Sequence, residues 1–297
     1  MGVGLAGEVA WAEDPKFVYG DSKDLKDVEK AEWKASAQVG LLMTTGNSQT
    51  ATGSGALDLS RKEGNNKLAV DVKGTYARST VIIAVDGNGD GVVQENEISR
   101  SEVTSAKSYE TKARYDRFFT DHDSAFLSAR AGADFPAGKD LLLGAQVGYA
   151  RQLYKSERHA LAGEAGYDFS YERYVASGTE PLNIHSARLF LGYKGTLNKA
   201  TGVFADVEAL FNLNSETSPT PGAEDIGAFE DMRIHAKTGL TTQIFGDLSF
   251  RFSFAVQYDR APAPAPLIGG LPYAPGFVPL ADTLDTTTEL ALVVSFL

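Results

Sequence analysis

The sequence predicts a transmembrane β-barrel of about twelve antiparallel strands. Apolar and polar residues alternate with a period of two along most of the chain, which places one set on each face of a sheet. Each alternating segment reaches the ~9–11 residues that a tilted strand needs to cross hydrocarbon. Short turns and longer loops then alternate between the segments. These three observations together are typical of a bacterial outer-membrane barrel.

The alternation is clearest near the C-terminus. Leu248, Phe250 and Phe252 lie on one face of a segment there, and Ser249 and Arg251 lie on the other. Segments of this kind begin near Glu32, Gln49, Lys67, Glu102, Ser124, Asp140, Arg158, Ile184, Gly202, Ala228, Asp247 and Thr283. An even number of strands returns the chain to the side on which it started.

The connections favour the same architecture. KEGNN, FTDHD, YKSE, LNKAT and FGD are short, whereas the connection that contains 86–97, between the third and fourth strands, and ASGTEPLN, 215–227 and 261–282 are mostly longer. MTTGNSQT and PAGK are short members of the second set. Short periplasmic turns opposite longer extracellular loops are expected in the outer membrane. We therefore expect outer-membrane lipid around a monomer, with the barrel assembly machinery as a partner during insertion.

A soluble β-sandwich or lipocalin-like barrel is the alternative, because one alternation fits both kinds of fold. Size favours the membrane protein, since twelve strands enclose a lumen too wide for apolar side chains to fill. In a membrane barrel the polar set lines the lumen and the apolar set meets lipid. Tyrosines and phenylalanines near strand ends fit an interfacial girdle, although the β-propensity of aromatic residues alone produces the same pattern. The girdle residues are Tyr76, Phe118, Phe119, Tyr149, Tyr154, Tyr171, Tyr174 and Tyr258.

Composition narrows the remaining classes. The chain has 297 residues, a formal net charge of −11 and no cysteine. The charge disfavours nucleic acid as a partner, and the lack of cysteine excludes disulfides and thiolate metal sites. Residues 1–12 end in an A-x-A-like signature and are interpreted as the remnant of a signal peptide or as an ordinary flexible terminus. Residues 13–31 are interpreted as a charged periplasmic lead-in, and 32–297 as the barrel.

Residues 86–97, DGNGDGVVQENE, match the calcium loop of an EF-hand. Such a loop places oxygen ligands at positions 1, 3, 5, 7, 9 and 12, with glycine at position 6. Gly91 occupies position 6 here. Val92 needs only its backbone carbonyl, and Gln94 acts through water. The ligands expected for Ca²⁺ are Asp86, Asn88, Asp90, Val92, Gln94 and Glu97.

Two features separate this loop from a calcium sensor. The β-branched stretch STVIIAV before Asp86 is typical of a strand, and only one helical turn is expected in EISRSE after the loop. Without a helix pair there is no groove to open, so calmodulin-like switching is not expected. The alternative is a metal-free turn, because Asp, Asn and Gly also favour tight turns.

The predicted lumen carries charges of both signs. A selective pore favours rings of one sign, whereas mixed signs favour cross-strand ion pairs that stiffen the wall and close the lumen. We therefore favour a closed or poorly conducting barrel over the alternative of a porin-like diffusion channel. The charged lumen residues expected are Lys34, Asp71, Lys73, Glu110, Lys112, Arg114, Asp116, Arg130, Asp134, Glu164, Asp168, Arg188, Lys194, Asp206, Glu208, Asp231, Arg233, Lys237, Arg251 and Glu289.

A hydrolase at the rim is a third hypothesis, which needs a histidine beside a serine or aspartate. His122 and His159 fall at or beside short turns, and His235 faces the predicted lumen. His185 lies next to Ser186, but adjacent residues on a strand point to opposite faces. None of the four has a hydrolase motif around it, so we expect no enzyme.

The segment AEWKASAQVGLLMTTGNSQTATGSGALDLSRKEGNNK resembles the opening hairpin of the YdiY-like salt-induced outer membrane proteins, a family built on a domain of unknown function. RYDRFFTDHDSAFLSARAGAD and LLLGAQVGYARQLYKSERHALAGEAGYDFSYER are similar to its central strands. The resemblance covers about Glu32 to Leu297 and implies an outer-membrane barrel without an assigned activity. Two features depart from the family: the EF-type loop is inserted, and Phe296 is penultimate where many such barrels end in an aromatic residue.

Overall fold

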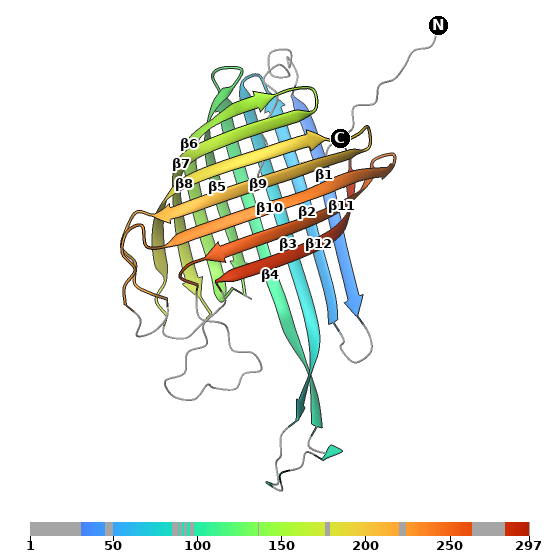
Figure 1. Ribbon diagram of the computed structural model, residues 1–297, viewed down its shortest axis with the longest axis vertical. Coiled ribbons are helices and arrows are strands. Elements are labelled where there is room, and N and C mark those ends of the chain that lie inside the picture. Colours follow the sequence, from blue (N-terminus) through green and yellow to red (C-terminus); the bar gives the residue numbers. More distant parts are fainter. Residues whose placement is uncertain are drawn as a thin grey trace.

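The computed structural model describes residues 31–44, 50–84, 89, 91, 94–95, 98–135, 137–175, 179–219, 224–262 and 283–296. Within these residues the chain forms twelve β-strands that close into one barrel (Figure 1). The strands are β1 (Glu32–Thr44), β2 (Thr50–Glu63), β3 (Asn66–Ala84), β4 (Ile98–Phe118), β5 (Asp123–Asp134), β6 (Lys139–Lys155), β7 (His159–Tyr174), β8 (Leu182–Thr196), β9 (Thr201–Asn212), β10 (Met232–Phe245), β11 (Leu248–Asp259) and β12 (Leu284–Ser295).

Each strand pairs antiparallel with its neighbours in the chain, and β1 closes the barrel against β12 from Ser36↔Ser295 to Val39↔Leu292. The predicted fold class is therefore confirmed. Ten strands begin within two residues of the predicted starts. The predicted start of β10 at Ala228 is wrong, because residues 228–230 form a turn in which Phe229 adopts φ 65°.

Two ends of the barrel differ in their connections. We call the end with the β2–β3, β4–β5, β6–β7, β8–β9 and β10–β11 connections the turn end, and the opposite end the loop end. β1 begins and β12 ends at the turn end. The predicted segments 1–12 and 13–31 lie outside the described residues, apart from Ala31. No helix long and apolar enough to cross a membrane occurs in the part of the chain that the structure describes.

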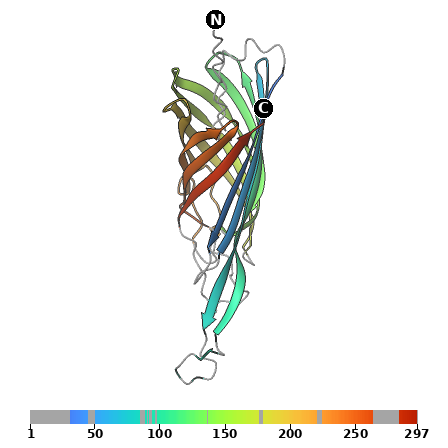
Figure 2. The ribbon, with the colours of Figure 1, turned by 90° about the vertical axis from the view of Figure 1, so that its right-hand side faces the viewer.

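The β3–β4 hairpin projects beyond the other strands at the loop end (Figures 1 and 2). β3 has 19 residues and β4 has 21, and their outermost pair is Ala84↔Ile98. The helical turn expected after residue 97 is wrong, because Ile98 to Ser101 continue the ladder with β3 instead. The predicted start of β4 at Glu102 is wrong for the same reason. Backbone hydrogen bonding to β3 outweighs the weak local preference for a helical turn.

Alternation assigns the two faces as predicted. Leu189 and Leu290 are 54% and 59% exposed on the outer face, whereas Arg188 and Asp168 are 2% and 0% exposed on the inner face. This is the reverse of a soluble barrel, in which the apolar set is buried. An outer surface of this kind needs lipid or detergent to cover it.

The lumen also holds apolar side chains. Phe126 and Phe190 are buried inside the barrel. Two of the predicted girdle residues, Phe118 and Tyr174, are also buried on the inner face, so their assignment to the lipid interface is wrong. Side chains alternate between the two faces of a strand, and Phe118 shares the inward face of β4 with Arg114 and Asp116 although it is aromatic.

Candidate functional site

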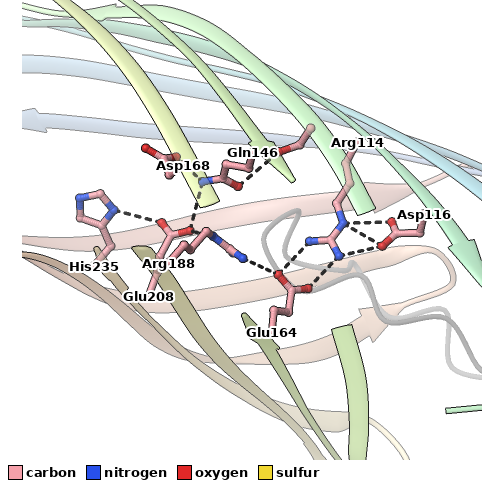
Figure 3. Close-up of polar contacts among 9 residues, drawn as sticks. Arg114, Asp116, Gln146, Glu164, Asp168, Arg188, Glu208 and His235 are labelled. Carbon is pink, nitrogen blue, oxygen red and sulfur yellow. Dashed lines mark hydrogen bonds and ion pairs between the residues drawn. The ribbon is translucent and has the colours of Figure 1, made fainter. Parts of the chain in front are cut away.

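The inner face of β4, β7, β8 and β9 carries a chain of four charged residues, which we call the central network: Arg114, Glu164, Arg188 and Glu208 (Figure 3). Each is at an inward position of its strand, because side chains on a strand alternate between faces. All four are buried. The sequence predicted that they face the lumen, and the structure shows that they meet there.

Arg114 and Glu164 form a bidentate ion pair. Nη2 of Arg114 lies 2.8 Å from Oε1 of Glu164, and Nη1 donates to Oε2 over 3.1 Å. β5 and β6 separate the two strands in the sheet, so the pair reaches through the lumen rather than along the wall. Asp116 receives the remaining donors of Arg114, with Nη2 2.7 Å from its Oδ1. A guanidinium matched in this way is held in one orientation.

Arg188 continues the network to the next strands. Its Nη1 lies 2.8 Å from Oε2 of Glu164, and its Nε lies 2.5 Å from Oε1 of Glu208. Glu164 thus accepts from two guanidinium groups, and Glu208 is also 3.4 Å from Nδ1 of His235. The arrangement neutralises charge pairwise instead of collecting one sign in a ring.

Phe126 of β5 forms an apolar platform for both arginines. Its ring centroid lies 4.2 Å from Cζ of Arg114 and 5.4 Å from Cζ of Arg188. Cation–π contacts of this kind are strongest where water is excluded. In the sequence Phe126 shares a face with Ser128 and with Arg130, which is expected in the lumen, and this alternation is the signal that places Phe126 there.

A layer of polar and charged side chains adjoins the central network. Gln146 donates from Nε2 to Oδ1 of Asp168 over 2.8 Å and accepts from Oγ of Ser128 over 3.2 Å. Ser170 donates to Oδ2 of Asp168 over 2.8 Å and accepts from Nη2 of Arg130 over 2.7 Å. These bonds occupy the inner faces of β5, β6 and β7 and leave Asp168 fully enclosed.

A second set of ion pairs crosses the loop end, which we call the mouth pairs. Nζ of Lys139 lies 2.8 Å from Oε2 of Glu172 and 3.6 Å from Oδ2 of Asp259. Lys139 is on β6 and Asp259 follows on β11, so β7 to β10 lie between them on the shorter way round. Nη1 of Arg233 on β10 lies 3.3 Å from Oε1 of Glu172. The pairs therefore tie opposite walls of the barrel together.

Hydrogen bonds between side chains link β11, β12, β1 and β2 across the lumen as well. Nη1 of Arg251 on β11 donates to Oε1 of Gln38 on β1 over 3.0 Å. Ser54 of β2 donates to Oε1 of Glu289 on β12 over 3.1 Å. Each contact passes over an intervening strand, so neighbouring parts of the wall are cross-linked.

The calcium prediction falls largely outside the described residues. Asp86, Asn88, Asp90, Val92 and Glu97 lie outside them, and Gln94 is exposed. Of the loop glycines, Gly91 adopts φ 79°. Among the residues that the structure describes, no group of three or more His, Cys, Asp or Glu side chains is arranged to hold a metal ion.

His185 and Ser186 are adjacent on β8 and therefore point to opposite faces of the barrel wall. His185 faces outward, where its ring hydrogen-bonds the hydroxyl of Tyr167 and packs against Phe169 with centroids 5.3 Å apart. Ser186 is buried in the lumen and accepts from Nη2 of Arg233 over 3.1 Å. The histidine and serine of a rim hydrolase are thus on opposite sides of the wall.

Comparison with solved structures shows distant likenesses to other barrels. The NanC porin is 8% identical over 88% of this chain and 97% of its own, with a TM-score of 0.43. An anion-selective porin from Comamonas acidovorans is 9% identical over 90% and 100%, with a TM-score of 0.37. The translocator domain of the autotransporter NalP from Neisseria meningitidis is 13% identical over 93% and 91%, with a TM-score of 0.36.

The comparison with curated proteins finds no match to this sequence. A family model does match, over residues 37–296, which is almost the whole barrel from β1 to the end of β12. Its description is a protein of unknown function, DUF481. Together with the closed twelve-stranded barrel, this match shows that the chain belongs to the DUF481 family.

Proposed function

We propose that this protein is a bacterial outer-membrane barrel with a role in the envelope, whose lumen is held closed by its own ion pairs. The observation that carries the proposal is the central network, which runs from β4 to β9 with Arg188 at its centre, 2% exposed. The low exposure of these side chains supports a lumen without a continuous aqueous path. The loop end faces the outside, as the longer loops of such barrels do.

The charge arrangement favours closure over selective conduction. A channel that selects ions presents a ring of one sign to the passing solute. Here Arg114 and Arg188 are each bonded to carboxylates, and the mouth pairs repeat the arrangement at the loop end. Buried pairs of this kind resist separation, because either partner alone is left as an uncompensated charge.

Osmotic swelling of proteoliposomes tests this role. We expect vesicles containing the wild-type barrel to swell in small sugars or amino acids no faster than protein-free vesicles. The matched control replaces Arg114, Glu164, Arg188 and Glu208 with serine, which removes two charges of each sign and shortens the side chains that cross the lumen. Swelling is expected with this variant. Solute-size-dependent swelling with the wild type would show a diffusion channel instead.

We also propose that residues 86–97 bind Ca²⁺ outside the cell. The supporting observations are the match of the sequence to the ligand pattern and the positive φ of Gly91 at position 6, where an EF-hand loop makes its sharp turn. In the sequence this loop follows β3 and precedes β4, the two strands whose hairpin projects beyond the others at the loop end (Figure 2). Calcium is abundant outside the cell, and extracellular modules bind it at about 10⁻⁴–10⁻³ M.

The calcium site is tested by calorimetry or terbium luminescence on the wild type and on Glu97→Gln. We expect a dissociation constant of about 10⁻⁴–10⁻³ M for the wild type and at least a tenfold loss in the variant, because Glu97 supplies the bidentate carboxylate. Glu95→Gln is the matched control, since Glu95 occupies a position that supplies no ligand. Undiminished binding by Glu97→Gln, or no wild-type binding at roughly 10 mM calcium, would leave the loop as a turn.

A further inference from the structure

The chain between β9 and β10 folds back onto the loop end and is tied down on both sides of residues 220–223, which lie outside the described residues. Asn212, the last residue of β9, is the anchor. Its Nδ2 donates to the carbonyl oxygens of Asn214 and Gly227, each over 2.9 Å, and its Oδ1 accepts from the backbone N–H of Asp231 over 3.0 Å. Glu216 and Ile226 exchange two backbone hydrogen bonds of 2.9 and 2.8 Å.

Two carboxylates in this segment are buried without full satisfaction. Glu216 is 6% exposed, and its Oε1 has no hydrogen-bond partner among the described residues. Asp231 is 4% exposed, and within the same residues its Oδ1 has none. Burial of an ionised carboxylate is unfavourable unless it is paired. Both side chains are therefore better accommodated with a proton than without one.

The surrounding charges do not supply the missing partners. Glu216 faces Arg233 of β10, Asp231 and Glu172 of β7. Asp231 faces Arg233, Glu172, Asp259 of β11 and Lys139 of β6.

The cations among these groups are already engaged. Lys139 and Arg233 both bond to Glu172, which also accepts from the Tyr174 hydroxyl. Nε of Arg233 reaches Oδ2 of Asp231 only at 3.5 Å. His185 of β8 contacts the segment through its backbone, while its ring bonds Tyr167 on the outer face. Four carboxylates thus share these two cations, and Arg130 of β5 adds a weaker attraction for Glu172.

We propose that the described residues between β9 and β10, 213–219 and 224–231, form a proton-dependent latch on the loop end. It stays docked while Glu216 and Asp231 are protonated, and it lifts away when both ionise, because repulsion from Glu172 and Asp259 is then added to the cost of burial. The central network contains neither residue. Release of the latch therefore exposes the mouth of the barrel without opening the lumen behind it.

The direction of the pH dependence follows from the buried state. Burial raises the pKa of Glu216 to about 7 and that of Asp231 to about 6, with Arg233 opposing the shift in both. Once the segment lifts, both carboxyls are solvated and return to ordinary values near 4. The docked state then binds more protons, so docking is fully favoured below ordinary carboxyl pKa values and is lost as the pH rises through about 6 to 7.

A spin label reports directly whether the latch is docked. The chain has no cysteine, so one introduced cysteine is the single labelling site. We place the label at Thr217→Cys, which is exposed and next to Glu216, and record its mobility in detergent from pH 5 to pH 9. Restricted motion is expected at pH 5 and fast motion at pH 9, with a midpoint between about 6 and 7. A label at Ser156→Cys, in a turn at the opposite end, is expected to be unaffected by pH.

Two variants make the test specific. Glu216→Gln with Asp231→Asn removes the titration while keeping the shape, so its label is expected to stay restricted across the whole range. Glu224→Gln, an exposed carboxyl in the same segment, is expected to keep the wild-type profile. A wild-type label indifferent to pH would overturn the latch, as would an unchanged midpoint in the double variant. Heat-modifiable migration on gels confirms that each variant is folded, and unchanged liposome swelling separates this result from the closure of the lumen.

Discussion

Replacing Arg188 with alanine is expected to destabilise the folded barrel by about 3–5 kcal/mol, the usual cost of removing one partner from a buried ion pair. Arg188 bonds to Glu164 over 2.8 Å and to Glu208 over 2.5 Å, and its side chain is almost fully enclosed. The change leaves Arg114 as the ion-pair partner of Glu164 and His235 as that of Glu208, and it removes a cation from the ring of Phe126. Urea unfolding in detergent, followed by the heat-dependent shift in gel migration, measures the loss.

Arg173→Ala is the matched control for this experiment. Arg173 also forms an arginine–carboxylate pair, with Nε 2.9 Å from Oδ1 of Asp140, but its side chain is 50% exposed. A solvated pair contributes at most about 1 kcal/mol. Arg188→Lys is expected to lose most of the stability as well, because an ammonium cannot present the fixed fork that serves two carboxylates. Equal losses at Arg188 and Arg173 would mean that water fills the lumen and solvates the network.

The second large effect concerns the outer face. Phe252→Arg is expected to destabilise the barrel by about 2–4 kcal/mol, as charges do on the lipid face near the midplane of such barrels. Phe252 lies midway along β11, opposite Leu240 on one side and Leu290 on the other. All three side chains belong to the outward set. The same unfolding assay in detergent or liposomes measures the effect.

Ser253→Lys tests the neighbouring position on the inward set. Oγ of Ser253 lies 3.5 Å from Oε2 of Glu289, so a lysine introduced there has a carboxylate beside it. We expect a clearly smaller loss than at Phe252. Similar losses at the two positions would show that the assignment of inner and outer faces is wrong, and with it the account of the lumen.

The sequence predicts the barrel because its strands are long and their alternation is regular. The alternation of side chains along each strand is enough to assign four residues to the lumen: Arg114, Glu164, Arg188 and Glu208. It does not say which of them meet, because that depends on strand stagger and on how the wall curves. Arg114 reaches Glu164 past two intervening strands, which no local pattern encodes.

The positions of some side chains differ from what the sequence predicts or are not predicted by it. The alternation along β5 places Phe126 in the lumen with Arg130, although its ring is apolar. Tyr174 is predicted for the lipid interface because tyrosines are common there, but its position in the alternation of β7 turns it into the lumen. Tyr174 instead donates to Glu172 at the mouth over 3.1 Å. The sequence does not predict that Glu216 is buried, since Glu216 lies in a loop without the apolar–polar alternation of a strand. Its burial arises from the anchoring of the segment by Asn212, which only the folded structure shows.

Single-channel current in planar bilayers tests most directly whether the lumen is closed. With the wild-type barrel inserted at moderate salt, we expect no steady conductance steps if, as we propose, the central network and the mouth pairs close the lumen. The fourfold serine variant of the central network is expected to produce such steps and shows that inserted protein is detected. Steady, ohmic steps from the wild type would contradict the account and identify the protein as a channel.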